Sequence, residues 1–83
     1  VCTDKTKVLL AETVSNPDMV VAQISVLDRI CHREGRDILL IVDNTFTPLI
    51  ARPLLLGADF VYHSLTKITS GRSDMLGGAV ISA

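Results

Sequence analysis

Between residues 38 and 44 the chain reads Ile38-Leu39-Leu40-Ile41-Val42-Asp43-Asn44, five aliphatic residues followed by an acid and an amide. Five residues make a typical strand, and a run without polar residues is typical of a strand that is buried on both faces of a sheet. Strands of this kind belong to parallel sheets, in which helical crossovers cover the two faces. The run therefore predicts an α/β domain with a mostly parallel sheet.

Three further apolar segments of strand length, at residues 7–12, 60–62 and 78–82, flank this run. Residues 52–57 predict one short helical turn closed by a glycine, and residues 69–74 predict a polar loop. Strands that alternate with a helix indicate βαβ units. One helix cannot cover both faces of such a sheet, so we expect the chain to need the rest of a larger domain for stable folding.

The helix is predicted between the first two strands, where the apolar residues change to a helical period. It begins near Gln23, a weak N-cap, and Gly35 is suited to end it. Its predicted apolar face consists of Ile24, Leu27, Ile30 and Cys31, and its polar face of Asp28, Arg29, Arg33 and Glu34.

Length and composition narrow the class of protein. The chain has 83 residues, enough for one small domain, and is 48% hydrophobic and 20% charged, which favours a packed core over disorder. The net charge of −1, with no basic stripe interleaved with aromatic residues, argues against a nucleic-acid partner. The apolar runs are too short to span a membrane. Cys2 and Cys31 lack the spacing of a disulfide framework or a zinc site, so we expect no metal and a reducing cytoplasm.

Polar clusters follow each of the first three predicted strands: Ser15-Asn16, then Asp43-Asn44, then Ser64, Thr66 and Lys67. In open α/β sheets, ligands bind beyond the carboxyl ends of the strands. If the strands are parallel neighbours, the three clusters face one crevice that contains one amine and one carboxylate. The sequence thus predicts a site that can bind an anion.

Each of these residues also has a simpler interpretation. Lys67 could be a solvated surface lysine, and Asp43 could begin a turn through an Asx bond. Ser64 and Thr66 are common loop hydroxyls, and Asn16-Pro17 is a common turn dipeptide that can adopt a cis bond. Only their joint placement favours the functional interpretation.

Five blocks of sequence carry a resemblance that covers nearly the whole chain. In order they are Glu12-Thr13-Val14-Ser15-Asn16-Pro17, Val42-Asp43-Asn44-Thr45-Phe46, Leu56-Gly57-Ala58-Asp59, His63-Ser64-Leu65-Thr66-Lys67, and Ser70-Gly71 with Ser73-Asp74-Met75-Leu76-Gly77-Gly78. Together they resemble the Cys/Met-metabolism family of pyridoxal-phosphate enzymes, which includes cystathionine γ-synthase, the cystathionine γ- and β-lyases and methionine γ-lyase. Five ordered blocks are far more specific than any one motif.

The resemblance implies that residues 1–83 are the central part of the large domain of a fold-type-I pyridoxal-phosphate enzyme, with the aspartate-aminotransferase-like fold. The strand at residues 78–82 would run antiparallel to the others. An N-terminal arm, a C-terminal domain and the groups that stack on the cofactor and bind the substrate carboxylate would lie outside the chain. The 83 residues alone are therefore expected to be inactive. Members are commonly cytoplasmic homotetramers, each a dimer of catalytic dimers.

The resemblance also implies roles for five residues. Lys67 would form a Schiff base with the aldehyde of pyridoxal phosphate and later carry protons between substrate carbons. Asp43 would pair with the pyridine nitrogen and keep it protonated, so that the ring accepts electrons. Ser64 and Thr66 would donate hydrogen bonds to the phosphate, and Asn16 would donate one to the phenolic oxygen.

The reaction implied is the making or breaking of a carbon–sulfur bond of a sulfur amino acid, by β- or γ-elimination or γ-replacement. Three positions depart from the common pattern of the family: Gln23 and Arg72 replace the usual Asp and His, and residues 45–49 are one residue short. The shorter segment favours a γ-lyase acting on methionine or cystathionine. Cystathionine γ-synthase and β-lyase remain alternatives.

Three other functions are compatible with parts of the sequence: a serine acyl-enzyme, a receiver-like signalling domain and a packing segment. Ser64 and Lys67 have the Ser-x-x-Lys spacing of serine acyl-enzymes, but the supporting motifs of that class are missing. Asp43 and Lys67 could belong to a receiver-like signalling domain, which needs an acidic pair after its first strand, whereas Glu12-Thr13 supplies one acid. The chain could also be a cofactor-free segment that serves subunit packing.

Overall fold

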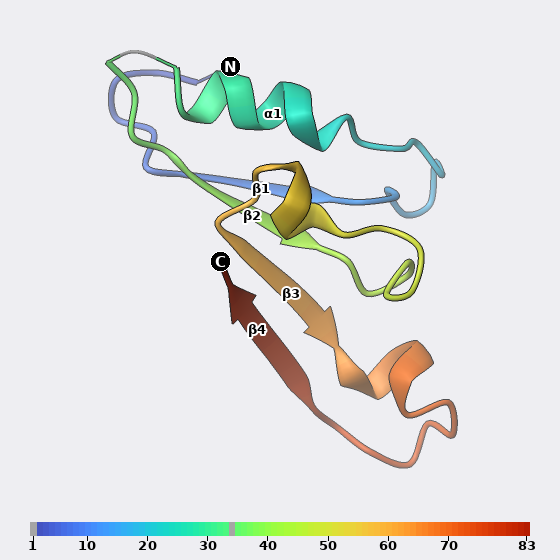
Figure 1. Ribbon diagram of the computed structural model, residues 1–83. Coiled ribbons are helices and arrows are strands. Elements are labelled where there is room, and N and C mark those ends of the chain that lie inside the picture. Colours follow the sequence, from blue (N-terminus) through green and yellow to red (C-terminus); the bar gives the residue numbers. More distant parts are fainter. Residues whose placement is uncertain (1, 34) are drawn as a thin grey trace.

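The computed structural model describes residues 2–33 and 35–83, which form a four-stranded sheet with strand order β1-β2-β3-β4 (Figure 1). In chain order the elements are strand β1 (Val8–Glu12), helix α1 (Ile24–Cys31), strand β2 (Leu39–Asp43), the 3₁₀ turn η1 (Pro53–Leu56), strand β3 (Phe60–Ser64), the π-helical turn η2 (Leu65–Thr69) and strand β4 (Gly78–Ser82). The first three strands are parallel, and β4 is antiparallel to β3. The predicted mostly parallel sheet, with an antiparallel last strand, is confirmed.

Side-chain alternation along the strands gives the sheet two different faces. On one face, Leu40 and Val42 of β2 are fully buried, and Val61 of β3 is 3% exposed. Helix α1 crosses this face above β1 and β2 (Figure 1), and its Ile24 and Cys31 complete the core with Ile38 and Ala58. Burying a side chain such as Leu40 contributes roughly 1.5–3 kcal/mol to folding.

The opposite face of the sheet is exposed among the described residues. Its apolar side chains include Val8 and Leu10 of β1, Leu39 of β2 and Val80 of β4, which are 47%, 70%, 43% and 68% exposed. The sequence predicts that β2 is buried on both faces of the sheet. Residues 2–33 and 35–83 cover only one of these two faces. The candidate site lies on the exposed face, at the carboxyl ends of the strands.

Helix α1 is shorter than predicted and ends at Cys31, four residues before Gly35. Its apolar face is also narrower, because Ile30 is 37% exposed while Ile24 and Cys31 are buried and Leu27 packs at the edge of the core. Arg29 and Arg33 face solvent as predicted. Glu34 lies outside the described residues.

The two irregular turns differ in how well the sequence predicted them. Turn η1 is closed by Gly57, as predicted, with φ +100°. A Cβ at Gly57 would lie 2.3 Å from Cγ of Asp28 on α1, so glycine is needed for the backbone conformation and for the close contact with α1. Turn η2 was not predicted, because the expected loop began only at Thr69.

In the described part of the chain, no helix is both long and apolar enough to cross a membrane.

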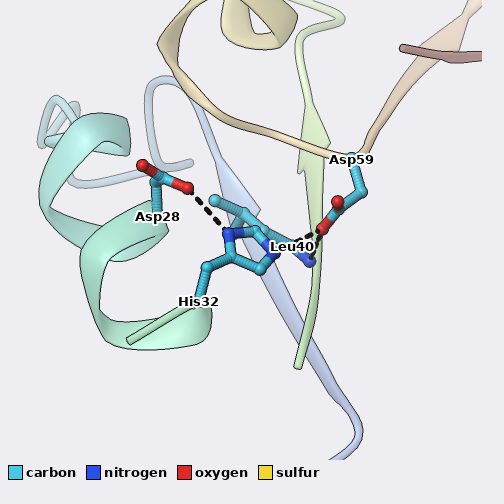
Figure 2. A network of polar contacts seen from close by, with 4 residues as sticks. All are labelled: Asp28, His32, Leu40 and Asp59. Atoms are coloured by element: carbon cyan, nitrogen blue, oxygen red, sulfur yellow. Dashed lines mark hydrogen bonds and ion pairs between the residues drawn. The ribbon is translucent and has the colours of Figure 1, made fainter. Parts of the chain in front are cut away.

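A histidine beyond the end of α1 connects this helix to the sheet. Figure 2 shows the ring of His32 between two carboxylates: Nδ1 lies 2.7 Å from Oδ1 of Asp28, and Nε2 lies 3.1 Å from Oδ2 of Asp59. The same Oδ2 accepts the backbone N–H of Leu40 at 2.7 Å. Both ring nitrogens can donate only when the ring is protonated. The arrangement therefore favours the protonated histidine.

This arrangement predicts a pH-dependent contribution to stability. The hydrogen bond to Asp28, together with the charge of Asp59, raises the pKa of His32 above 6.5 although partial burial opposes the shift. The contribution is complete below pH 6.5 and is lost as the pH rises through the raised pKa. Because the ring is partly exposed, the loss should not exceed about 1 kcal/mol.

The measurement is the thermal midpoint of the whole protein between about pH 5.5 and about pH 8, the range in which histidine titrates. The variant His32→Gln retains a side-chain donor but cannot titrate, so its midpoint should vary less with pH than that of the wild type. His63 is present in both proteins, so any contribution that it makes to the pH dependence is the same in both. Equal pH slopes in the two proteins would show that the His32 contacts contribute nothing.

Candidate functional site

The carboxyl ends of β1, β2 and β3 border a cavity of about 230 Å³ on the open face of the sheet. Its lining residues are Glu12, Val14, Asn16, Asp43, Thr45, Phe46, Tyr62, Ser64 and Lys67. Two carboxylates come from β1 and β2, whereas the amine comes from η2 and two hydroxyls, those of Tyr62 and Ser64, come from β3. The cavity thus has acidic groups from one side of the sheet and an amine from the other.

Four of the five predicted site residues line this cavity: Asn16, Asp43, Ser64 and Lys67. Thr66 does not line it. Its Oγ1 accepts the backbone N–H of Gly77 at 3.0 Å and donates to the carbonyl of the same residue at 3.3 Å. Because η2 begins at Leu65, the chain turns away from the strand direction there and directs this hydroxyl to the segment before β4.

Asp43, the last residue of β2, is held through one of its two carboxylate oxygens. Oδ1 accepts two hydrogen bonds from Thr45, one from the backbone N–H at 2.9 Å and one from the hydroxyl at 2.5 Å. This is the Asx bond of the simpler interpretation, and it coexists with a place in the cavity. Among the described residues, all side-chain hydrogen bonds of Asp43 use Oδ1, which leaves Oδ2 as an acceptor for a ligand.

Lys67 lies in the middle of η2, three residues after the end of β3. Its backbone dihedrals, φ −87° and ψ −116°, depart from helical values and interrupt the turn. Two backbone hydrogen bonds hold the segment around it, from Ser70 to Leu65 at 2.9 Å and from Gly71 to Lys67 at 3.0 Å. The side chain forms no ion pair with residues 2–33 or 35–83, so its amine is available to a ligand.

Asn16 reaches the cavity from the loop after β1. Its backbone N–H donates to Oε2 of Glu12 at 3.0 Å, and its peptide bond to Pro17 is cis, as the sequence allowed. Ser15, the neighbour with which it was grouped, instead uses its hydroxyl to accept the backbone N–H of Val20 at 3.0 Å. The loop thus presents one of the two polar side chains to the cavity.

Asn44 was grouped with Asp43 but points to the other face of the sheet and is 2% exposed. Its Oδ1 accepts hydrogen bonds from the hydroxyls of Thr13, at 2.7 Å, and Thr47, at 2.6 Å. Its Nδ2 donates to the carbonyl of Ala51 at 3.1 Å. This buried group joins the ends of β1 and β2 directly beneath the cavity.

Removal of the Asn44 side chain should therefore weaken the fold rather than the chemistry. The variant Asn44→Ala leaves Thr47 without its acceptor, leaves Thr13 with only a backbone acceptor, and should lower the free energy of unfolding by about 2–3 kcal/mol. Thr47→Val, which removes one of these hydrogen bonds, should cost about 1 kcal/mol. Denaturation of both variants checks whether Asn44→Ala loses more stability than Thr47→Val. An Asn44→Ala protein as stable as the wild type would contradict the prediction.

Five of the lining residues have no role predicted from the sequence: Glu12, Val14, Thr45, Phe46 and Tyr62. For Thr45 a signal existed, because an Asp side chain often bonds the residue two positions on. For Glu12 and Tyr62 the signal is absent, since they become neighbours of Asp43 only through the strand register.

The groups of the cavity suit an organic ligand with chemically different ends. A carboxylate oxygen without a partner can accept from a protonated ring nitrogen, a primary amine can attach to a carbonyl carbon, and hydroxyl and amide groups can bind oxygens. Among the described residues, no group of three or more His, Cys, Asp or Glu side chains is placed to hold a metal ion.

Comparisons with known proteins agree with this chemistry. The sequence model of the Cys/Met metabolism PLP-dependent enzyme family matches residues 1–83. The chain is 50% identical over 80 residues to a cystathionine gamma-synthase/O-acetylhomoserine (thiol)-lyase of Bacillus subtilis, covering 95% of this chain and 21% of that protein. It is 46% identical over 76 residues to the methionine gamma-lyase of Arabidopsis thaliana, covering 92% of this chain and 17% of that protein.

The fold of a solved relative also matches. The crystal structure of metB from Corynebacterium glutamicum superposes with a TM-score of 0.90 at 40% identity, covering 98% of this chain and 21% of that one. The chain thus spans about a fifth of the length of the relatives that it matches.

Proposed function

This chain belongs to the Cys/Met metabolism family of pyridoxal-phosphate-dependent enzymes, and from this premise we propose that its cavity is the cofactor-binding part of an active site. The observation that carries the proposal is the presence of Lys67 and Asp43 in one cavity, with Oδ2 of Asp43 free of partners among the described residues. An amine and a carboxylate are the two groups that this cofactor needs from the protein. Family membership leaves the acyl-enzyme, receiver and packing hypotheses without support.

The residues present fit pyridoxal phosphate by their chemistry. Lys67 supplies the amine to which the cofactor aldehyde attaches, and Asp43 supplies the acceptor for the ring nitrogen. Ser64 supplies a hydroxyl for the phosphate, and Asn16 supplies an amide for the phenolic oxygen. A second phosphate contact from Thr66 stays a prediction, and it requires the hydroxyl to exchange its bonds to Gly77 for one to the phosphate.

The chain's own residues then have two tasks in catalysis. Asp43 keeps the ring nitrogen protonated, so that the bound cofactor can accept electrons from a substrate carbon. Lys67 would take protons from the substrate and return them to it.

We propose that the whole enzyme makes or breaks a carbon–sulfur bond in a sulfur-containing amino acid. The relatives support this class without separating its members, because a methionine gamma-lyase and a gamma-synthase/thiol-lyase match at 46% and 50% identity. The short segment at residues 45–49 favours a γ-lyase, and further lyases match at 42–46% identity.

We also propose that residues 1–83 are part of a larger domain that covers the open face of the sheet, in a cytoplasmic enzyme that assembles as a dimer of dimers. The exposed Val8, Leu10 and Val80 support the first of these points, since that much apolar surface favours burial. Size measurement on the full-length enzyme tests the assembly.

The experiment that tests the activity uses the full-length enzyme with methionine, cystathionine and an O-acylated homoserine plus a thiol. A γ-lyase consumes water and releases a thiol, ammonia and an oxo acid from methionine or cystathionine, whereas a synthase replaces the acyloxy group of the acylated homoserine with the thiol and releases a carboxylic acid. Turnover of none of these substrates by cofactor-loaded enzyme would contradict the proposed reaction class.

A further inference from the structure

The hydroxyl of Thr45 connects the two sides of the cavity. Its Oγ1 lies 2.5 Å from Oδ1 of Asp43, at the end of β2, and 2.9 Å from the backbone nitrogen of Ser64, at the end of β3. The two strands pair up to Asp43 and Tyr62, and a last backbone bond from Asn44 to Tyr62 measures 2.9 Å. The Thr45 side chain therefore extends the connection between β2 and β3 beyond the strand pairing.

The chemistry of the partners fixes the direction of both hydrogen bonds. A backbone N–H can only donate, so the Thr45 oxygen accepts from Ser64. The single hydroxyl hydrogen then goes to Asp43, whose ionised carboxylate can only accept. With the Thr45 backbone N–H also directed at Oδ1, the carboxylate is held by two donors on one oxygen. Its rotation is restricted, and Oδ2 keeps one orientation in the cavity.

The same hydroxyl holds the start of the segment that carries Lys67. Ser64 is the residue before η2, and Lys67 follows three positions later. A shift of the Ser64 backbone would thus move both the lysine and the Thr45 hydroxyl that orients Asp43.

We propose that Thr45 is a positioning residue, which sets the carboxylate of Asp43 relative to the Lys67 segment by donating to the first and accepting from the backbone of the second. This inference rests on the proposed function, because it assigns Thr45 an effect on the two groups, Asp43 and the Lys67 segment, that would serve the cofactor. Thr45 itself needs no contact with substrate. The shared hydroxyl would fix the position of the Asp43 carboxylate, which would bind the ring nitrogen, relative to the Lys67 amine, which would attach to the aldehyde.

The test uses the full-length enzyme loaded with pyridoxal phosphate. Thr45→Val keeps the shape of the side chain and removes the hydroxyl, and it should lower kcat by about 10- to 100-fold, the range for loss of a partner that orients a binding group. KM should change much less, because the substrate is not contacted. Thr45→Ser, which keeps the hydroxyl, should restore most of the rate.

A matched control and a double variant separate positioning from stability. Thr6→Val also removes a hydroxyl that accepts a backbone N–H, from Thr3 at 2.9 Å, but at the opposite end of β1, and kcat should stay within about threefold of wild type. In an Asp43→Asn background, Thr45→Val should cause a much smaller loss than in the wild type, because most of its effect acts through the carboxylate. If Thr45→Val does not fold, Thr45→Ala serves in the same comparison.

Two results would overturn the inference: a Thr45→Val enzyme within about threefold of wild type, or an equal loss with and without Asp43→Asn. A different result would count against the proposed function itself. If Asp43→Asn alone left turnover unchanged, then Asp43 would not serve the cofactor, whatever Thr45 does.

Discussion

Replacement of Lys67 with alanine should reduce turnover of the full-length enzyme by about 10²- to 10⁴-fold, the range for loss of a positioned acid–base group. Of the described residues that line the cavity, Lys67 alone brings an amine, and it lies there with Asp43 and Asn16. Without it, the described lining residues would offer the cofactor no amine for attachment, and the proposed proton carrier would be lost. Steady-state rates, measured with saturating cofactor, check the prediction.

The matched variant is Lys67→Arg, which keeps the positive charge but offers no amine that can lose its proton. If charge alone mattered, this variant would recover activity. We expect Lys67→Arg to be as inactive as Lys67→Ala. Both proteins should fold, because Lys67 is exposed and makes no ion pair with the described residues.

Replacement of Asp43 with asparagine should lower kcat by about 10²- to 10³-fold, the cost of removing one group that stabilises charge in the transition state. The amide oxygen can still accept both hydrogen bonds from Thr45, so the turn after β2 should persist. The group that replaces Oδ2 is a donor, however, and cannot accept from a protonated ring nitrogen. The ring then accepts electrons poorly.

Cofactor retention should suffer less than turnover in this variant. Loss of one charged hydrogen bond corresponds to a roughly 10- to 100-fold weaker affinity, and the attachment to Lys67 would remain. Parallel measurement of kcat and of cofactor dissociation separates the two effects. An Asp43→Asn enzyme that loses its cofactor but works normally when saturated would contradict the role of electron-sink partner.

Much of the fold could be predicted because the core strands are short and continuously apolar. Residues 38–42 and 60–62 predicted β2 and β3 to within two residues at each end. The end of α1 could not be predicted, because Gly35 indicates a stop but His32 is held earlier by Asp28 and Asp59. That contact with Asp59 joins residues 27 positions apart, and no local pattern reveals it.

The location of the candidate site could be predicted in part, because it follows from the order and direction of the strands. Parallel strands bring their carboxyl ends together, and Asn16, Asp43 and Lys67 line one cavity there, as this rule predicts. The alternation of side chains along a strand separates Asp43 from Asn44, and this rule could have assigned Asn44 to the buried face. The direction of Thr66 depends on η2, whose mixed sequence has no clear period, so its contact with Gly77 was not foreseen.

The most direct test of the central claim is chemical. Borohydride treatment of the cofactor-loaded, full-length enzyme, followed by proteolysis and mass spectrometry, should find the reduced cofactor bound to Lys67. The visible absorbance of the bound cofactor should disappear in the same step. Cofactor found on another lysine, or a Lys67→Ala enzyme that still traps cofactor and keeps full activity, would contradict the account.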